Sequence, residues 1–152
     1  MKWMNAASLL FLLLSAAACN TNDKAPAASE NNIDAARNFI RAALDGKFNE
    51  AREYMIQDSL NNNLLDLAER SYKNSSQDTR DGYRASSIRF HPPIVNLNDS
   101  TSVIIYSNSY KNDPDTLRVI RVGAEWRVDL KSLYPAMTDP APIQPITTDS
   151  IK

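Results

Sequence analysis

The stretch SVIIYSNSYKNDPDTLRVIRVGAEWRVDL, residues 102–130, decides the fold because it has the patterning of consecutive strands. Apolar, β-branched and aromatic residues dominate 102–110, which predicts a strand. The run NDPD at 112–115 predicts a turn, and Gly-Ala at 123–124 predicts another. We therefore expect two further strands, over 116–122 and 125–130, and strands joined by such short turns are antiparallel.

The segment before this stretch adds one irregular strand. Residues 83–90 alternate loosely, with Ile88 and Phe90 on one face. Pro92 and Pro93 interrupt the alternation, because proline has no amide hydrogen to donate to a strand ladder. Apolar residues resume after the prolines, and the run NLNDS predicts a turn before the next strand.

Helical spacing characterises the first half of the domain. Apolar residues recur every three or four positions over 33–44, where Asn32 is placed to cap the helix. A short helix is expected over 48–55, and a third begins after a cap at Asp58 or Ser59. Three N-terminal helices followed by a bent antiparallel sheet predict an α+β domain.

The N-terminus has the pattern of an export signal. Lys2 supplies a positive charge, an apolar run follows, and small residues lead to Cys19, the only cysteine in the chain. The run over 6–18 has 13 residues. A membrane-spanning helix needs about 20 residues. We therefore expect residues 1–18 to be a signal peptide.

Residues 16–19, AAAC, resemble the lipobox of bacterial lipoproteins, although most members have leucine at the position of Ala16. The resemblance implies that acyl chains such as palmitate are attached at Cys19, which becomes the first residue of the mature protein. The alternative is an ordinary signal peptide followed by a chance cysteine. Asn20, in place of aspartate, favours the outer membrane by the rule known for some lipoproteins. We therefore expect a lipid-anchored protein of the bacterial cell envelope, in the outer membrane rather than the inner.

Composition divides the mature chain into three parts. Residues 19–32 have no aliphatic side chain larger than alanine and predict a flexible tether, whereas the proline-rich residues 135–152 predict a disordered tail. The domain is expected over 33–134. Removing residues 1–18 takes away Lys2 and no acid, which moves the formal net charge from −1 to −2. That balance, without a basic cluster, argues against a nucleic-acid partner.

Three parts of the chain resemble the nuclear-transport-factor-2-like superfamily, and in particular its small secreted lipoproteins of unassigned function. FIRAALDGKFNEAREYM (39–55) is similar to their opening helix, glycine turn and short helix, and residues 102–122 are similar to their long hairpin. A closing Gly-x-x-Trp-x-Val-Asp pattern is matched by Gly123, Trp126, Val128 and Asp129. The resemblance covers most of 33–131 and implies a cone-shaped domain, in which a bent sheet wraps over the helices. The Pro92-Pro93 break departs from the smoother first strand of the family.

This superfamily includes isomerases and dehydratases, so a small pocket enzyme acting on an apolar ligand is the alternative function. Acids and tyrosines of the kind such sites use are present, but none matches a catalytic motif of the family: Asp45, Asp58, Asp66, Asp129, Tyr54, Tyr72 and Tyr106. His91, the only histidine, lies beside two prolines and has no carboxylate nearby in sequence. Phosphate-binding glycine loops, Gly-x-Ser-x-Gly and histidine or cysteine metal clusters are missing from the sequence. We therefore assign no catalytic residue, cofactor or metal.

A non-catalytic binding or assembly module is the function that we expect. The candidates for lining a pocket between helices and sheet are Phe39, Tyr54, Tyr72, Tyr106 and Trp126. Such a pocket would take a small apolar ligand, but the same rings simply fill the interior if it is close-packed.

An exposed sheet face is the other candidate surface, for a homodimer or an envelope protein partner. Alternation over 102–110 separates two sets of side chains, one with Tyr106, Asn108 and Tyr110, the other with Val103, Ile105, Ser107 and Ser109. The sequence leaves open which set is outside.

Four short patterns resemble acceptor sites of bacterial O-glycosylation, which have Asp, then Ser or Thr, then an aliphatic or similar residue. They are Asp58-Ser59-Leu60, Asp99-Ser100-Thr101, Asp115-Thr116-Leu117 and Asp149-Ser150-Ile151. Asp99-Ser100-Thr101 lies in a predicted turn and Asp149-Ser150-Ile151 in the tail. The hypothesis is that Ser100 and Ser150 carry glycans. Turn and capping chemistry is the alternative explanation, and the one that we favour.

Overall fold

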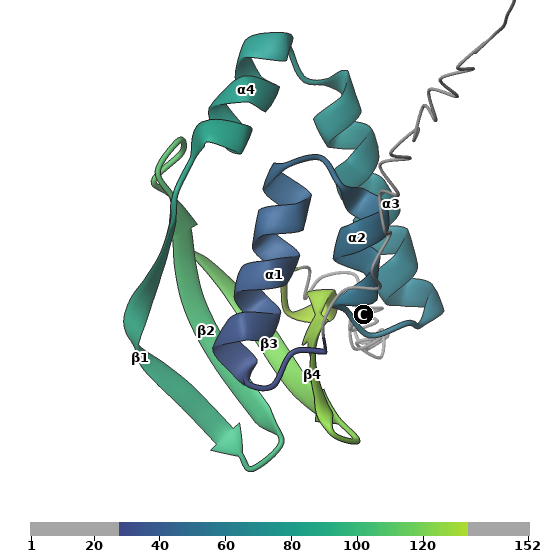
Figure 1. Cartoon of the computed structure of the whole chain (residues 1–152), viewed down its shortest axis with the longest axis vertical. Helices are drawn as coiled ribbons and strands as arrows, with labels where there is room; N and C mark the ends of the chain where they lie inside the picture. Colours follow the sequence, from purple (N-terminus) through teal and green to yellow (C-terminus); the bar gives the residue numbers. More distant parts are fainter. Residues whose placement is uncertain (1–27, 134–152) are drawn as a thin grey trace, which may run out of the picture.

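The computed structural model describes residues 28–133, which form four α-helices and one four-stranded antiparallel sheet (Figure 1). The helices are α1 (Asn32–Leu44), α2 (Phe48–Glu53), α3 (Ser59–Asn74) and α4 (Gln77–Ala85). The strands are β1 (Ile88–Asn98), β2 (Thr101–Asn108), β3 (Asp115–Val122) and β4 (Glu125–Asp129), and the 3-10 helix η1 (Leu130–Leu133) follows them. Helices followed by antiparallel strands confirm the α+β class.

Several sequence predictions concern parts of the chain outside the described residues. These are the signal peptide over 1–18, the lipidated Cys19 with the first part of the tether, and the proline-rich tail with Ser150. Over residues 28–133, none of the helices combines the length and the apolar character that crossing a membrane would require.

The N-cap of helix α1 lies one residue before Asn32, the residue that we expected to cap it. Asn31 is the N-cap, and its Oδ1 accepts from the backbone N–H of Asp34 at 2.9 Å. Asp34 also places a negative charge in the first turn, where the helix dipole favours it. The helix ends before Gly46, whose φ of +76° is the left-handed conformation that glycine adopts without steric cost.

Four helices precede the sheet rather than the three that we expected, since α4 occupies 77–85, where we expected loop and the start of a strand. Ser76 caps it, with Oγ accepting from Thr79 N–H at 3.2 Å. None of its residues is buried, so the sequence has no apolar stripe to reveal it. The Arg41 guanidinium on α1 holds the C-terminal end of α4 by donating to the Ser86 carbonyl at 2.7 Å.

The strands follow one another across the sheet in the order β1-β2-β3-β4. The β1–β2 register shifts between His91 and Val95, which confirms that Pro92 and Pro93 interrupt the pairing. An edge strand tolerates this, because one side of its backbone has no strand to pair with. The opposite edge, β4, is covered by other backbone segments: Val128 N–H donates to the Tyr54 carbonyl at 2.9 Å.

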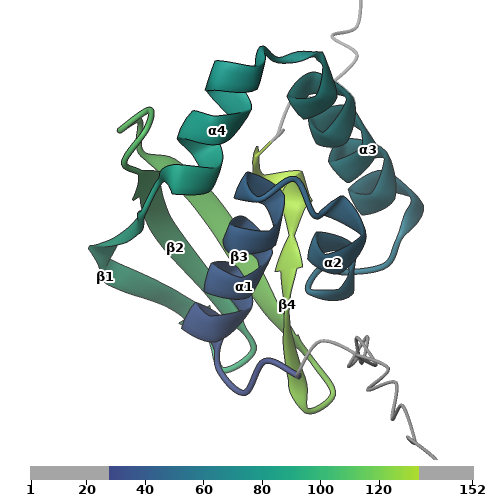
Figure 2. The ribbon, with the colours of Figure 1, turned by 45° about the horizontal axis from the view of Figure 1, so that its top comes forward.

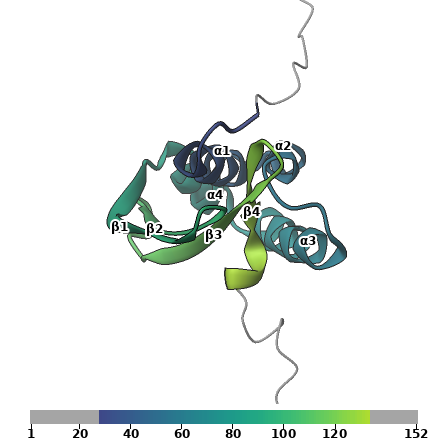
Figure 3. The same ribbon diagram turned by 90° about the horizontal axis from the view of Figure 1, so that it is seen from below.

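Helix α1 lies over one face of the curved sheet, with α4 near its C-terminal end, whereas α2 and α3 lie on the side of β4 (Figures 2 and 3). α1 contacts all four strands. The core between these layers contains Phe39 and Ile40 from α1 with Ile104, Leu117, Val119 and Val128 from the sheet. As expected, Val128 is fully buried on the helix side, and Trp126 packs against the same core.

The register also decides which face of β2 is outside. Ile104 is fully buried opposite Leu117, so the side of β2 with Ile104 and Tyr106 faces the helices. Val103 and Ile105 therefore lie on the face away from α1. Strand β3 places Ile120 on that same face. This face is called the outer sheet face below.

Candidate functional site

A hollow of about 470 Å³ opens at the C-terminal end of α1. Its walls come from α1, α2, α3, the end of β2, and one residue of α4. Five aromatic rings line it, those of Phe39, Phe48, Tyr72, Tyr83 and Tyr106. Alanine and leucine side chains of α1 and α3 complete an apolar wall. The volume is within the range of about 300–1,000 Å³ that is usual for small-molecule sites.

The rings form a connected row. Phe48 and Tyr72 meet edge to face, with centroids 5.5 Å apart, and Tyr72 stacks on Tyr83 at 6.2 Å. The row continues to Tyr110, whose ring meets Tyr83 edge to face at 5.2 Å. Each such aromatic pair contributes about 0.5–1.5 kcal/mol of stabilisation beyond that from the burial of its surface. The aromatic row therefore ties α2, α3, α4 and the β2–β3 turn together around the hollow.

Two glycines make room for this row. A Cβ at Gly46 would lie 2.7 Å from Cε1 of Tyr72, and a Cβ at Gly82 would lie 2.3 Å from Cε2 of Tyr110. Both distances are shorter than real carbon contacts. Gly82 thus allows α4 to lie directly against the Tyr110 ring, next to the ring of Tyr83.

Polar groups in the hollow are few. The Tyr72 hydroxyl donates to the Leu44 carbonyl at 3.4 Å, and Asn108 Oδ1 accepts from the backbone N–H groups of Tyr110 and Lys111. Among the described residues, those that line the hollow include no aspartate, glutamate, histidine, lysine or arginine. The arrangement can bury an apolar or aromatic molecule and offers it a small number of neutral hydrogen-bonding groups.

The structure brings three of the five predicted lining residues together and places two elsewhere. Phe39, Tyr72 and Tyr106 all line this hollow. Tyr54 is the C-cap of α2 beside β4, where burial, and secondarily the charge of Glu50, raises the pKa of its hydroxyl.

Trp126 lies at the other end of α1, where it lines a second hollow. Sequence reasoning missed Tyr83 and Phe48 as lining residues. Phe48 shares a helical face with Ala51, which is a signal for burial, but Tyr83 sits in a helix that has no apolar stripe.

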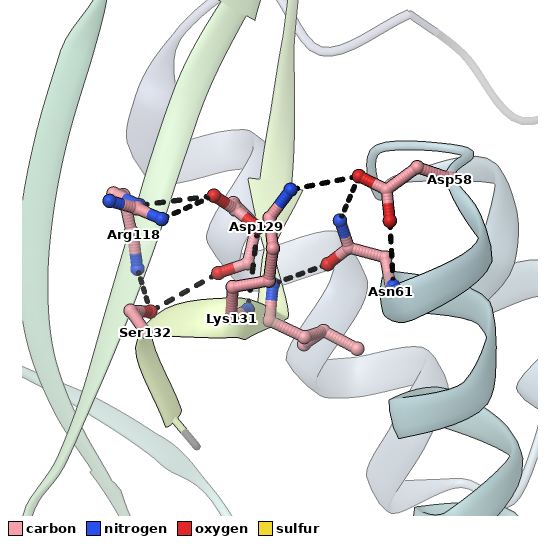
Figure 4. Close-up of polar contacts among 7 residues, drawn as sticks. Asp58, Asn61, Arg118, Asp129, Lys131 and Ser132 are labelled. Atoms are coloured by element: carbon pink, nitrogen blue, oxygen red, sulfur yellow. Dashed lines mark hydrogen bonds and ion pairs between the residues drawn. The ribbon is translucent and has the colours of Figure 1, made fainter. Parts of the chain in front are cut away.

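The acids considered for catalysis form ion pairs outside this hollow. Asp45 pairs with Arg41 at 2.7 Å, and Asp66 pairs with Arg52 at 2.6 Å. Asp58 and Asp129 belong to a polar cluster between α3 and the β4–η1 corner, which Figure 4 shows.

Asn61 is the centre of that cluster and is fully buried (Figure 4). Its Oδ1 accepts from the Leu130 backbone N–H at 2.7 Å, and its Nδ2 donates to Asp58 Oδ2 at 2.9 Å. The same Asp58 oxygen accepts from the Lys131 ammonium at 2.8 Å. These contacts fasten the start of α3 to the end of the sheet.

Hydrogen bonds within this cluster shift the pKa values of Asp58 and Lys131. The pKa of Asp58 falls to about 2, chiefly because its carboxylate accepts from the Asn61 backbone N–H and then from Lys131. The pKa of Lys131 rises, mainly through its bond to Asp58. Asp129, whose side chain is 2% exposed, accepts from Arg118 at 2.6 Å. We therefore interpret the cluster as structural: it stabilises the packing of α3 against the end of β4 and η1.

Two other residues named from the sequence are also placed. His91 lies on β1 with its Nε2 at 2.9 Å from the buried Ser107 hydroxyl. Ser100 is exposed in the β1–β2 turn, where its N–H donates to Asn98 Oδ1 at 2.9 Å. Over residues 28–133, no group of three or more histidine, cysteine, aspartate or glutamate side chains is arranged to hold a metal ion.

No family model, curated protein or solved structure matches this chain.

Proposed function

We propose that this protein is a lipid-anchored, non-catalytic binding module of the bacterial cell envelope, whose small apolar ligand occupies the aromatic-lined hollow. The observation that carries the proposal is the hollow itself, about 470 Å³ with walls of aromatic and aliphatic side chains. Concave sites of this size with mostly aromatic and aliphatic walls are the usual form of small-molecule sites, which favours an apolar ligand here.

The chemistry of the lining supports binding rather than turnover. An isomerase or dehydratase of the kind found in the nuclear-transport-factor-2-like superfamily needs an acid or a histidine that faces the substrate. The described lining residues supply tyrosine, serine and asparagine as their polar side chains. Asp58, an acid with a strongly shifted pKa, is shifted downwards and lies in the polar cluster. A pocket enzyme is therefore the weaker alternative.

The envelope location rests on the N-terminal sequence. The apolar run, the small residues and Cys19 together favour export and lipid attachment, with the outer membrane as the destination. Membership of the nuclear-transport-factor-2-like superfamily is part of the same proposal, and helices over one face of a curved antiparallel sheet are compatible with it.

Native mass spectrometry of the full protein, purified from its own host in two unrelated mild detergents, tests the proposal. We expect a stoichiometric adduct of the same mass in both detergents. Ala68→Trp should abolish the adduct, because Ala68 lines the hollow and an indole there would fill it. The matched control is Ala124→Trp at the exposed β3–β4 turn, which should keep the adduct.

Thermal unfolding followed by circular dichroism establishes that both variants are folded. A bare wild-type protein, or an adduct that survives Ala68→Trp, would exclude the hollow as the binding site. Turnover of the released ligand by the wild-type protein would replace the binding proposal with the enzyme alternative.

The outer sheet face is the site that we assign to assembly, as a second candidate function. Val95 and Val122 are 44% and 50% exposed there, on the same face as Val103, Ile105 and Ile120. Arg118 and Arg127 lie between these apolar side chains on that face. Apolar side chains gathered on one face favour contact with another protein surface. Sedimentation of wild-type protein and of the Val122→Lys variant tests this: a dimer lost in the variant supports assembly, whereas a wild-type monomer with no co-purifying protein argues against it.

A further inference from the structure

The second hollow lies at the N-terminal end of α1, the opposite end from the aromatic-lined site. It has a volume of about 350 Å³ and is lined by Asn31, Asn32, Asn96, Asn98, Asp99 and Trp126. α1 supplies Asn32, β1 supplies Asn96 and Asn98, and β4 supplies Trp126. Segments far apart in sequence therefore bring amide groups and an indole to one place.

Hydrogen bonds through a buried serine hold two of these amides in place. Asn32 Nδ2 donates to Ser102 Oγ at 2.7 Å, and Ser102 Oγ donates to Asn96 Oδ1 at 2.7 Å. Ser102 is only 1% exposed, so its hydroxyl is committed to this chain of bonds. The two amides are consequently preorganised, which reduces the entropy lost when a ligand binds.

The other amide atoms of these asparagines are available to a ligand as hydrogen-bond donors and acceptors. Over residues 28–133, Asn32 Oδ1 and Asn96 Nδ2 make no hydrogen bond to another side chain or backbone group. Asn98 uses its Oδ1 for Ser100, and within the described chain its Nδ2 has no partner. Residues that line the hollow thus keep one amide acceptor and two amide donors without a partner in the described chain, and Trp126 adds an indole to the same lining.

We infer that this second hollow binds a neutral sugar. A pyranose ring has hydroxyl groups that both donate and accept, which matches amide groups of both kinds. Its C–H face is apolar and packs against an aromatic ring, the role that Trp126 would serve here. The lining has no basic side chain, and the Asp99 carboxylate disfavours an anionic ligand. This site is separate from the apolar ligand site and does not depend on it.

Saturation-transfer NMR on the full protein in a polyoxyethylene detergent, which contains no sugar, tests the inference. The probes are the methyl glycosides of glucose, galactose, mannose and N-acetylglucosamine, with methyl glucuronide as the anionic comparison. We expect saturable transfer to at least one neutral glycoside and weaker transfer to the glucuronide. Asn96→Asp should reduce affinity by about tenfold or more, because it keeps the acceptor for Ser102 but replaces the available donor with a charged oxygen.

Trp126→Phe should also weaken binding, since it keeps a ring in the core but removes part of the aromatic surface and the indole N–H. The matched control is Asn63→Asp, which adds the same charge at an exposed position on α3 and should leave sugar binding unchanged. Ala68→Trp, which blocks the first hollow, should also leave it unchanged. Absence of transfer to every neutral glycoside, equal transfer in Asn96→Asp, or preference for the glucuronide would overturn the inference.

Discussion

Replacing Asn61 with aspartate tests whether the buried polar cluster fastens α3 to the sheet. The wild-type amide accepts from the Leu130 N–H and donates to Asp58 Oδ2. Aspartate has nearly the same shape and keeps the acceptor, but it replaces the donor with an oxygen that faces the Asp58 carboxylate. The single change therefore isolates the donated hydrogen bond from packing.

The magnitude follows from the charges. Two carboxylates about 4 Å apart repel by about 4 kcal/mol at an effective dielectric of about 20. The introduced acid can escape this by holding a proton, which also restores a donor to Asp58. Keeping an acid of ordinary pKa near 3.9 protonated at pH 7 costs about 4 kcal/mol, and at pH 5 about 1.5 kcal/mol. Lys131 already bonds Asp58 and lies 3.6 Å from Asp129, so it offsets only part of the repulsion.

We therefore expect Asn61→Asp to lose about 3–4 kcal/mol of unfolding free energy at pH 7 and to recover about 2 kcal/mol at pH 5. The folded variant holds its extra proton at pH values where the unfolded chain has released it, so acidification favours the folded state. Urea unfolding followed by far-ultraviolet circular dichroism at both pH values measures this. Asn63→Asp, exposed on the same helix, should change by no more than about 0.5 kcal/mol. An equal loss at both pH values, or a loss below about 1 kcal/mol at pH 7, would refute the role given to Asn61.

Three further predictions concern other contacts. Asp58→Asn keeps a helix cap but loses the charge, so it should cost about 0.5–1 kcal/mol at neutral pH, with solvent screening of its partly exposed side chain included. Because the pKa of Asp58 is lowered in the folded state to about 2, this difference should fade as the pH falls from about 4 towards 2 in acid titrations of stability. Gly82→Ala should gain about 1 kcal/mol of helix propensity only when Tyr110→Ala removes the ring that lies 2.3 Å from the new Cβ; a double-mutant cycle that shows no coupling would contradict the contact. Arg118→Met should cost about 2–3 kcal/mol in chemical unfolding, because it leaves the Asp129 carboxylate buried with a weaker partner, and an unchanged midpoint would show that the pair is dispensable.

Local patterning was sufficient for much of the fold. The strands of the 102–130 stretch and the first three helices were predictable, because the apolar periodicity and the capping residues that specify them are features of the local sequence. The interruption of β1 at Pro92 was predictable for the same reason, since the missing amide hydrogen is a property of the residue itself. Helix α4 was not predictable from periodicity, because none of its residues is buried and its position depends on Arg41, on Gly82 and on the Tyr110 ring.

The candidate sites divide in the same way. The sequence alone determined the α+β class, the near-neutral charge and a supply of aromatic residues for a pocket, and it carries an N-terminal pattern that predicts export and lipidation. Only the tertiary structure decided that Phe39, Tyr72 and Tyr106 meet at one end of α1, while Trp126 joins a group of asparagines at the other end. The physical reason is that these residues come from segments far apart in the chain, and separation in sequence does not tell how far apart two residues lie in space. The sheet register and the path of α1 together set those spatial distances.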